Sequence, residues 1–347
     1  MFGKFIKNFF TATVVGLFLV LGINYFVDPF GIYPFTPIKG INLLKIKTAS
    51  RMAIAMRMIR YQPKMVALGT SRVAIGFEGD VLKNYSEDDS YFNAGFAGAS
   101  FDEMYAYFEH ALYVQPNLKT IILGIDLFSF GENRNPQVDF NHERLQRNDF
   151  VLKDVKHSLI SFKSLWSSFE CVCRNMFDLE IPNEIHQIGE ENLFNLMLNA
   201  KDTYQNYALD QEKINKFRNI VDICKAGSIE LKVFVCPIKA KYWEFYCTNG
   251  LWPHVENLKR QLCFIHPVWD FSGYNPITTE SFDSNGVALY QDCSHFTTFT
   301  GELLLKRIFG HPSPIDSIGF LLTPETVEKS FKQILSQRDA WNFSNGK

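Results

Sequence analysis

A serine, a histidine and an aspartate stand where they could share one nucleophilic reaction. Ser71 lies in the segment Gly69-Thr70-Ser71-Arg72, directly after a short apolar run. Asp292 and His295 are close together in the chain, just before an apolar stretch that predicts a helix. A serine hydroxyl is a weak nucleophile at neutral pH and needs a base, which in turn needs an orienting carboxylate. His295 is the candidate base, and Asp292 is the candidate carboxylate.

The negative charge that develops on an attacked carbonyl oxygen needs hydrogen-bond donors. We expect the backbone N–H groups of Ser71 and Gly95 to supply them, because glycine lets the backbone approach a substrate closely. Each feature alone is weak. A Gly-x-Ser after a strand is commonly a tight turn, an Asp-x-x-His pair is commonly a solvated helix start, and Asn93-Ala94-Gly95 is ordinary turn chemistry. Their order along the chain makes the hypothesis specific.

The segments between these residues predict a parallel α/β sheet. Short apolar runs end in glycine-containing loops at 65–69, 91–95 and 120–124, and the pattern resumes at 231–237 and 268–271. A helix begins at Phe101, where Ser100 and Glu103 form a capping box, and a last one begins near Thr297. Strands that alternate with helices favour a parallel sheet. Sites in such sheets form at the carboxyl ends of the strands.

Two regions depart from this pattern. Residues 131–227 are richer in Asn, Glu and Lys and contain stretches with helical character, such as Leu193–Ala200 and Gln211–Cys224. They are predicted to be a helical insertion. Residues 312–347 are predicted to be a C-terminal tail.

The N-terminal segment predicts a membrane anchor. Phe9–Val27 carries no charged residue and is about long enough to cross a bilayer as a helix. Lys4 and Lys7 precede it, which favours a cytoplasmic N-terminus and an extracytoplasmic remainder. A cleaved signal peptide is the rival, although the apolar run is long and no small-x-small site precedes Asp28. A buried core helix is the structural alternative. We expect residues 1–27 to form a single-pass anchor in the cytoplasmic membrane.

Prolines and glycines break any helix after this segment, so residues 28–45 are expected to be a stalk. An amphipathic helix is expected to follow within residues 46–61, because apolar and arginine side chains alternate there with helical spacing.

Composition excludes some classes of protein. The chain has 347 residues, with 35 Lys and Arg against 37 Asp and Glu. This balance argues against a nucleic-acid binder, which normally has a basic excess. The seven cysteines lack zinc-site spacing, and His142, His254 and His266 lie in unrelated contexts, so no metal or other cofactor is expected. Most thiols are expected to be buried. If the domain is exported, one disulfide could form between two of the cysteines.

The ordered motifs resemble those of the SGNH/GDSL hydrolases. The family's first block, usually Gly-Asp-Ser, is similar to Gly69-Thr70-Ser71, and its second-block glycine is similar to Gly95. Its fifth block, Asp-x-x-His, matches Asp292 and His295. The third block, usually Gly-x-Asn-Asp, resembles Gly124-Ile125-Asp126, with Asp126 where the oxyanion-binding Asn would stand. This departure leaves the role of Asp126 as a third oxyanion donor open.

The resemblance implies a three-layer, flavodoxin-like α/β/α domain over residues 62–311. It also implies a serine esterase or O-acyltransferase that works through an acyl-enzyme. The anchor and Thr70 resemble membrane-anchored members that act on cell-envelope polymers, as in alginate O-acetylation and teichoic-acid D-alanylation. The expected partners are an acylated glycan or small ester, the membrane and envelope assembly proteins.

Two alternatives accompany this prediction. The chain could be a catalytically inactive envelope protein of the same fold that binds a polymer or an assembly partner. Arg72, next to the serine, could steer an anionic substrate, or it could form a structural salt bridge.

Overall fold

The computed structural model describes residues 2–145, 148–179, 204, 206–313, 315 and 318–344. The chain divides into two compact units. One unit combines Met1–Arg60 with Asn141–Glu184, and the other combines Tyr61–Phe140 with Ile185–Lys347. We call them the N-terminal unit and the sheet unit. Each is described by itself.

The sheet unit is mixed α/β and contains a six-stranded sheet with the order β2-β1-β3-β4-β5-β6. Neighbouring strands from β2 to β5 pair in parallel, and β6 pairs antiparallel with β5 at the edge. The parallel strands confirm the expected sheet. The strands are β1 (Met65–Gly69), β2 (Tyr91–Gly95), β3 (Thr120–Ile125), β4 (Glu230–Val235), β5 (Val268–Asp270) and β6 (Phe320–Leu322).

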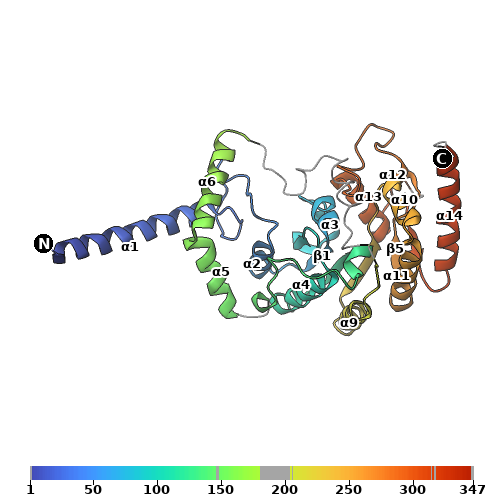
Figure 1. Cartoon of the computed structure of the whole chain (residues 1–347), viewed down its shortest axis with the longest axis horizontal. Coiled ribbons are helices and arrows are strands. Elements are labelled where there is room, and N and C mark those ends of the chain that lie inside the picture. Colours follow the sequence, from blue (N-terminus) through green and yellow to red (C-terminus); the bar gives the residue numbers. More distant parts are fainter. Residues whose placement is uncertain are drawn as a thin grey trace. The chain divides into compact units, whose positions relative to one another are not determined.

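Helices flank the sheet and connect its strands (Figure 1). The α-helices of this unit are α3 (Ser71–Gly76), α4 (Phe101–Val114), α9 (Gln211–Ala226), α10 (Ala240–Thr248), α11 (Trp252–Ile265), α12 (Pro276–Thr279), α13 (Thr298–Phe309) and α14 (Val327–Ser344). Short 3-10 turns cover Lys83–Tyr85, Glu87–Asp89 and Leu127–Phe130. The α4 helix begins with the predicted capping box of Ser100 and Glu103.

The two faces of the sheet are both buried, as its unbroken apolar strands require. On one face Ala67, Ile122 and Phe234 pack with side chains of α3 and α13 in a single core cluster. The residues that alternate with these point to the opposite face and are also buried, including all of β1 and β3. Helix α9 packs against both α4 and α11 in the same unit.

The predicted boundaries of the insertion differ from the structure. Helix α9 belongs to the sheet unit, because its apolar residues Ile214, Phe217 and Val221 are buried and it packs on α4 and β4. It is the crossover from β3 to β4. Only 141–184 joins the N-terminal unit. The predicted helix Leu193–Ala200 lies outside the described residues.

The segment expected to be a C-terminal tail is partly structured. Strand β6 extends the sheet, and the α14 residues Val327, Phe331 and Ile334 are buried. The strand was missed because three residues carry too little pattern to read as β structure.

The N-terminal unit is built from helices. They are α1 (Phe2–Val27), α2 (Arg51–Tyr61, which ends one residue into the sheet unit), α5 (Asn148–Ile160) and α6 (Phe162–Met176), with a 3-10 turn at His142–Arg144. The expected stalk is folded rather than extended. Phe30 and Ile32 pack with Met52 and Met56 of α2 in a small core. Asp28 fixes the turn before them, because its carboxylate accepts the backbone N–H groups of Ile32 and Tyr33.

Helix α1 is apolar along almost its whole length. Its mean hydropathy reaches 2.0, and among the described residues it alone is long and apolar enough to cross a membrane. A signal sequence would satisfy the same criteria of length and composition.

Candidate active site

Three glycines at strand ends allow α3 to sit close against the sheet. A Cβ at Gly69 would lie 2.3 Å from Cγ2 of Val73, and one at Gly124 would lie 2.4 Å from the same atom. A Cβ at Gly95 would lie 2.4 Å from the backbone N of Ala74. Real Cβ atoms do not approach so closely, so the first turn of α3 needs glycine at all three positions. This packing fixes Ser71, the first residue of α3.

The structure brings Ser71, His295 and Asp292 together although the first two are 224 positions apart. The Ser71 Oγ lies 2.8 Å from Nε2 of His295. The other ring nitrogen, Nδ1, lies 2.5 Å from Oδ2 of Asp292. Because Nδ1 faces the carboxylate, we assign the ring proton to it, which leaves Nε2 to accept the Ser71 O–H. His295 and Asp292 are buried, whereas Ser71 is half-buried.

The turn that carries Asp292 and His295 is held by the same carboxylate. The Oδ1 atom of Asp292 accepts the backbone N–H groups of Ser294 and His295, at 2.7 and 2.8 Å. Burial by itself raises the pKa of Asp292, but the hydrogen bonds from the His295 ring and the two N–H groups outweigh it, so the pKa is lowered. Asp292 is therefore ionised and oriented toward the imidazole.

A second buried network lies beside the first. Asp126, at the end of β3, accepts the Thr70 hydroxyl on Oδ2 at 2.6 Å and pairs with Nη1 of Arg72 through Oδ1. The Nε of Arg72 donates to the Ser294 carbonyl at 3.1 Å. Thr70 is also the N-cap of α3 and accepts the Arg72 N–H. The ion pair and these hydrogen bonds together tie the start of α3 to the ends of β1 and β3 and to the turn that bears His295.

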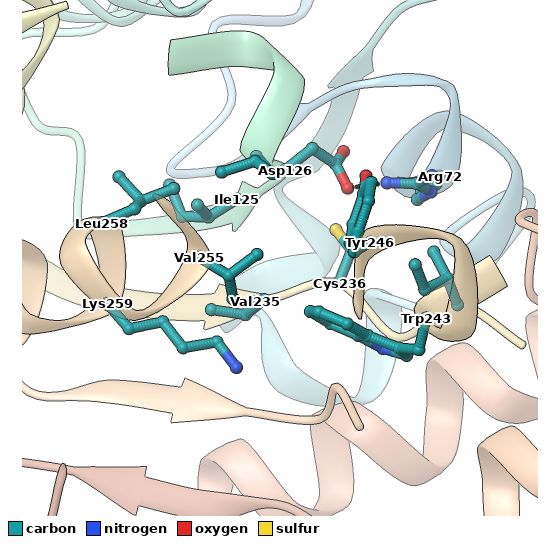
Figure 2. A pocket seen from close by; sticks show the side chains of 12 residues that line it. Arg72, Ile125, Asp126, Val235, Cys236, Trp243, Tyr246, Val255, Leu258 and Lys259 are labelled. Carbon is teal, nitrogen blue, oxygen red and sulfur yellow. Dashed lines mark hydrogen bonds and ion pairs between the residues drawn. The ribbon is translucent and has the colours of Figure 1, made fainter. Parts of the chain in front are cut away.

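This network answers the question left open for position 126. Both carboxylate oxygens of Asp126 accept hydrogen bonds, so the side chain does not donate to an oxyanion. Figure 2 shows its ion pair with Arg72. Burial by itself lowers the pKa of Arg72, but attraction to Asp126 outweighs it and the pKa is raised, so the guanidinium is charged. Arg72 is 3% exposed and forms the structural salt bridge rather than an exposed anion site.

The two backbone N–H groups predicted to bind the oxyanion differ in whether they already have a hydrogen-bond partner. Ser71 is the first residue of α3, and a backbone N–H there has no partner within its own helix. The Gly95 N–H instead donates to Oδ1 of Asn93 at 2.9 Å. The amide nitrogen of Asn93 donates to the carbonyls of Val73 and Ala74, both at 3.0 Å. Gly95 thus serves the packing of α3, and its N–H is already engaged.

A small cavity lies behind the Arg72–Asp126 pair. Its volume is about 20 Å³, room for one water molecule. Figure 2 shows Val255 and Leu258 of α11 facing Trp243 and Tyr246 of α10 across it, and Ile125 and Val235 also line it. Ser71, Asp292 and His295 are not among its lining residues.

Three residues contribute to this region in ways that the sequence did not predict. Thr70, Asn93 and the Ser294 carbonyl all hold α3 or the His295 turn through hydrogen bonds. The available signal was that Thr70, Asn93 and Ser294 lie inside the motifs Gly69–Ser71, Asn93–Gly95 and Asp292–His295. All seven cysteines are free thiols, five of them buried, so no disulfide constrains the site.

Comparisons with known proteins give little guidance. No family model matches the chain, and no curated protein matches it. Among solved structures it is similar to a chain described as "a putative platelet activating factor from Streptococcus pneumonia". The identity is 10%, the TM-score is 0.34, and the match covers 76% of this chain and 92% of that one. A likeness at this level does not identify a function.

Proposed function

We propose that the sheet unit is a serine-dependent hydrolase or acyltransferase of the SGNH/GDSL kind that acts on ester bonds. The observation that supports this most is the chain of contacts from Ser71 through His295 to Asp292. A nucleophile, a base and an orienting carboxylate in this order are the parts that acyl transfer requires.

In the proposed reaction the Ser71 oxygen attacks the acyl carbonyl while Nε2 of His295 takes the hydroxyl proton. Asp292 stabilises the imidazolium that forms. His295 then returns the proton to the departing alcohol, which leaves the acyl group on Ser71. Water or a second alcohol attacks this ester next, again with His295 as the base. The Ser71 N–H is the proposed donor to the carbonyl oxygen as it becomes negative.

The proposed substrate class is an O-acylated glycan of the cell envelope, as the family resemblance implies. We also propose that α1 anchors the chain in the cytoplasmic membrane, with the sheet unit outside the cytoplasm. Lys4 and Lys7 before the apolar run support this orientation.

A second function is favoured by one specific observation. Gly95 and Asp126, two of the three predicted oxyanion contributors, are engaged in structural hydrogen bonds. A protein of this fold that only binds an envelope polymer or an assembly partner would have no need of those donors. Reactivity of Ser71 separates the two functions.

The test is covalent labelling of the full-length protein with a fluorophosphonate, followed by intact-mass measurement. The wild type should gain one adduct, which peptide mapping places on Ser71. Ser71→Ala should gain none and should lose hydrolysis of a model acetyl ester. Ser284→Ala, at an exposed serine, is the matched control and should label as the wild type does. A folded wild type that neither labels nor turns over ester would exclude the enzyme and leave the binding function.

A further inference from the structure

Helix α6 of the N-terminal unit turns its apolar face outward. Its buried residues are small and polar or weakly polar: Ser164, Ser167, Ser168 and Cys171. Its aromatic residues and its methionine are exposed, with Phe162 at 81%, Trp166 at 63%, Phe169 at 60% and Met176 at 61%. Residues at these spacings lie along one stripe of a helix. This is the reverse of the pattern expected for a helix that faces water. We call these four residues the α6 stripe.

The charged residues of α6 keep away from the stripe. At 100° per residue, Lys163, Glu170 and Arg174 all project to one flank of the helix, between the stripe and the buried serines. Glu170 and Arg174 form an ion pair on that flank, at 3.0 Å. A helix with aromatic residues on one face and charges beside it has the composition of a helix that lies in a membrane interface.

The same unit contains the apolar helix α1, and polar contacts join the two. The amide nitrogen of Asn24 donates to the Leu159 carbonyl at the end of α5, at 2.8 Å. The Ser168 hydroxyl donates to Oδ1 of Asn24, also at 2.8 Å. Asn24 is one of only two residues of α1 that are buried. The buried polar face of α6 therefore serves to bind the C-terminal end of α1.

This attachment determines where α6 would lie relative to a bilayer. Most of α1 before Asn24 is exposed and apolar, including Phe9, Phe18 and Leu19. If those turns cross the hydrocarbon region, the attached end of α1 emerges at the lipid–water interface. In Figure 1, α5 and α6 run across that end of α1 rather than along it. Tryptophan and phenylalanine are enriched at that depth.

We propose that α6 is an interfacial membrane helix whose stripe of Phe162, Trp166, Phe169 and Met176 inserts among lipid acyl chains beside α1. This inference goes beyond the esterase chemistry and rests on the proposed membrane insertion of α1. The interface contact would hold the N-terminal unit against the bilayer surface. The unit would then keep one orientation relative to α1 and the bilayer, instead of hanging from α1 as from a flexible tether.

The test uses the full chain in vesicles of phosphatidylcholine and phosphatidylglycerol, with and without bromine on the acyl chains. Bromine quenches tryptophan emission only at contact distance. The wild type should be quenched by the brominated lipid, and Trp166→Phe should lose most of that quenching. Trp341→Phe is the matched control, because Trp341 lies in α14 of the sheet unit, where its ring contacts Tyr274 at 5.4 Å. It should keep the quenching.

Two outcomes would overturn the proposal. Equal quenching in the wild type and Trp166→Phe would mean that Trp166 does not touch lipid. A Trp166 emission that is blue-shifted but unquenched would mean that protein, either a second copy or another part of the chain, covers the stripe. Extraction of the vesicles with alkaline carbonate tests α1 separately, since release of the chain would show that α1 is not inserted. Fluorophosphonate labelling of Ser71 should be unchanged in Trp166→Phe. A failure of the esterase proposal can therefore be told apart from a failure of the membrane proposal.

Discussion

Two buried carboxylates of the site contact basic side chains of different kinds. Asp292 contacts an imidazole, whose charge can change during a reaction near neutral pH. Asp126 contacts a guanidinium, which stays charged throughout. A carboxylate that stabilises a transient charge can contribute to catalysis, whereas one that neutralises a permanent charge contributes to structure. In the proposed reaction Asp292 therefore has the chemical role, whereas Asp126 positions the His295 turn.

The first prediction concerns Asp126→Asn, which places at this position the Asn that is usual in the third block of the SGNH/GDSL hydrolases. It should destabilise the protein by about 3–5 kcal/mol, because it leaves the Arg72 charge buried without its partner. The double variant Arg72→Met, Asp126→Asn should be less destabilised than the single one, since it removes the charge as well. Urea denaturation of the full chain in detergent measures both. A stable Asp126→Asn protein with raised esterase activity would mean that this side chain acts on the oxyanion after all.

The second prediction concerns Asp292→Asn and pH. The pKa of Asp292 is lowered from its ordinary value of 3.8, so ionised Asp292 stabilises the fold above that pH. This stabilisation is lost as the pH falls through the lowered folded pKa. The difference in unfolding free energy between wild type and Asp292→Asn should therefore be constant near neutral pH and shrink in acid.

Activity provides a separate readout of Asp292→Asn. We expect esterase turnover to fall by roughly 10³–10⁴, because the imidazole loses both its charge stabilisation and its fixed tautomer. Ester turnover by the wild type and the variant is compared at neutral pH. A difference in stability that grows toward acid pH, or activity that is unchanged, would contradict the assigned role.

At the scale of elements, α3 is held between the sheet and α13. Its first turn rests on three strand-end glycines, and its last turn meets α13 through another close approach. A Cβ at Gly301 of α13 would lie 1.9 Å from the backbone oxygen of Gly76. Since α3 begins with Ser71 and α13 follows the His295 turn, their packing sets the distance between the proposed nucleophile and its proposed base.

The third prediction is that Gly301→Ala pushes α13 away from α3. Overpacking of this kind typically costs about 1–3 kcal/mol. The rate of fluorophosphonate labelling at Ser71 should fall as well. Ser71 is part of α3 and His295 lies just before α13, so moving the two helices apart lengthens the distance between these side chains. Glu302→Ala is the control on the neighbouring position, where a surface ion pair with Lys306 is lost. It should change stability by about 0.5 kcal/mol or less. Wild-type labelling by Gly301→Ala would refute the coupling.

The sequence predicted these elements where local pattern and tertiary role agree. The runs before Gly69, Gly95 and Gly124 were readable as buried strands, and the motifs Ser71 and Asp292–His295 followed from their places beside them. The Arg72–Asp126 pair could not be derived, because it joins distant loops whose spacing is set by strand order. The hydrogen bond from the Gly95 N–H to Asn93 could not be derived either, because a tight turn and an oxyanion site can have the same local sequence.

At the scale of the whole chain, the N-terminal helix has a partner inside its own unit. If α1 were removed, Asn24 would go with it, and the Ser168 hydroxyl and the Leu159 carbonyl would lose this hydrogen-bond partner. Unsatisfied buried polar groups cost about 1–3 kcal/mol each. These contacts favour a retained anchor over a cleaved signal peptide.

The last prediction concerns the orientation of α1 as the proposed membrane anchor. Alkaline phosphatase fused after residue 347 should be active in a bacterial host, because that enzyme needs an extracytoplasmic location to fold. Green fluorescent protein at the same place should be dark. The intact mass of the purified chain should include residues before Asp28. Replacing Lys4 and Lys7 with glutamine removes the positive charges that precede the apolar run, so it should lower phosphatase activity relative to expression. If instead the phosphatase fusion is inactive and the green fluorescent protein fusion is fluorescent, the sheet unit lies in the cytoplasm, where an envelope glycan could not reach Ser71.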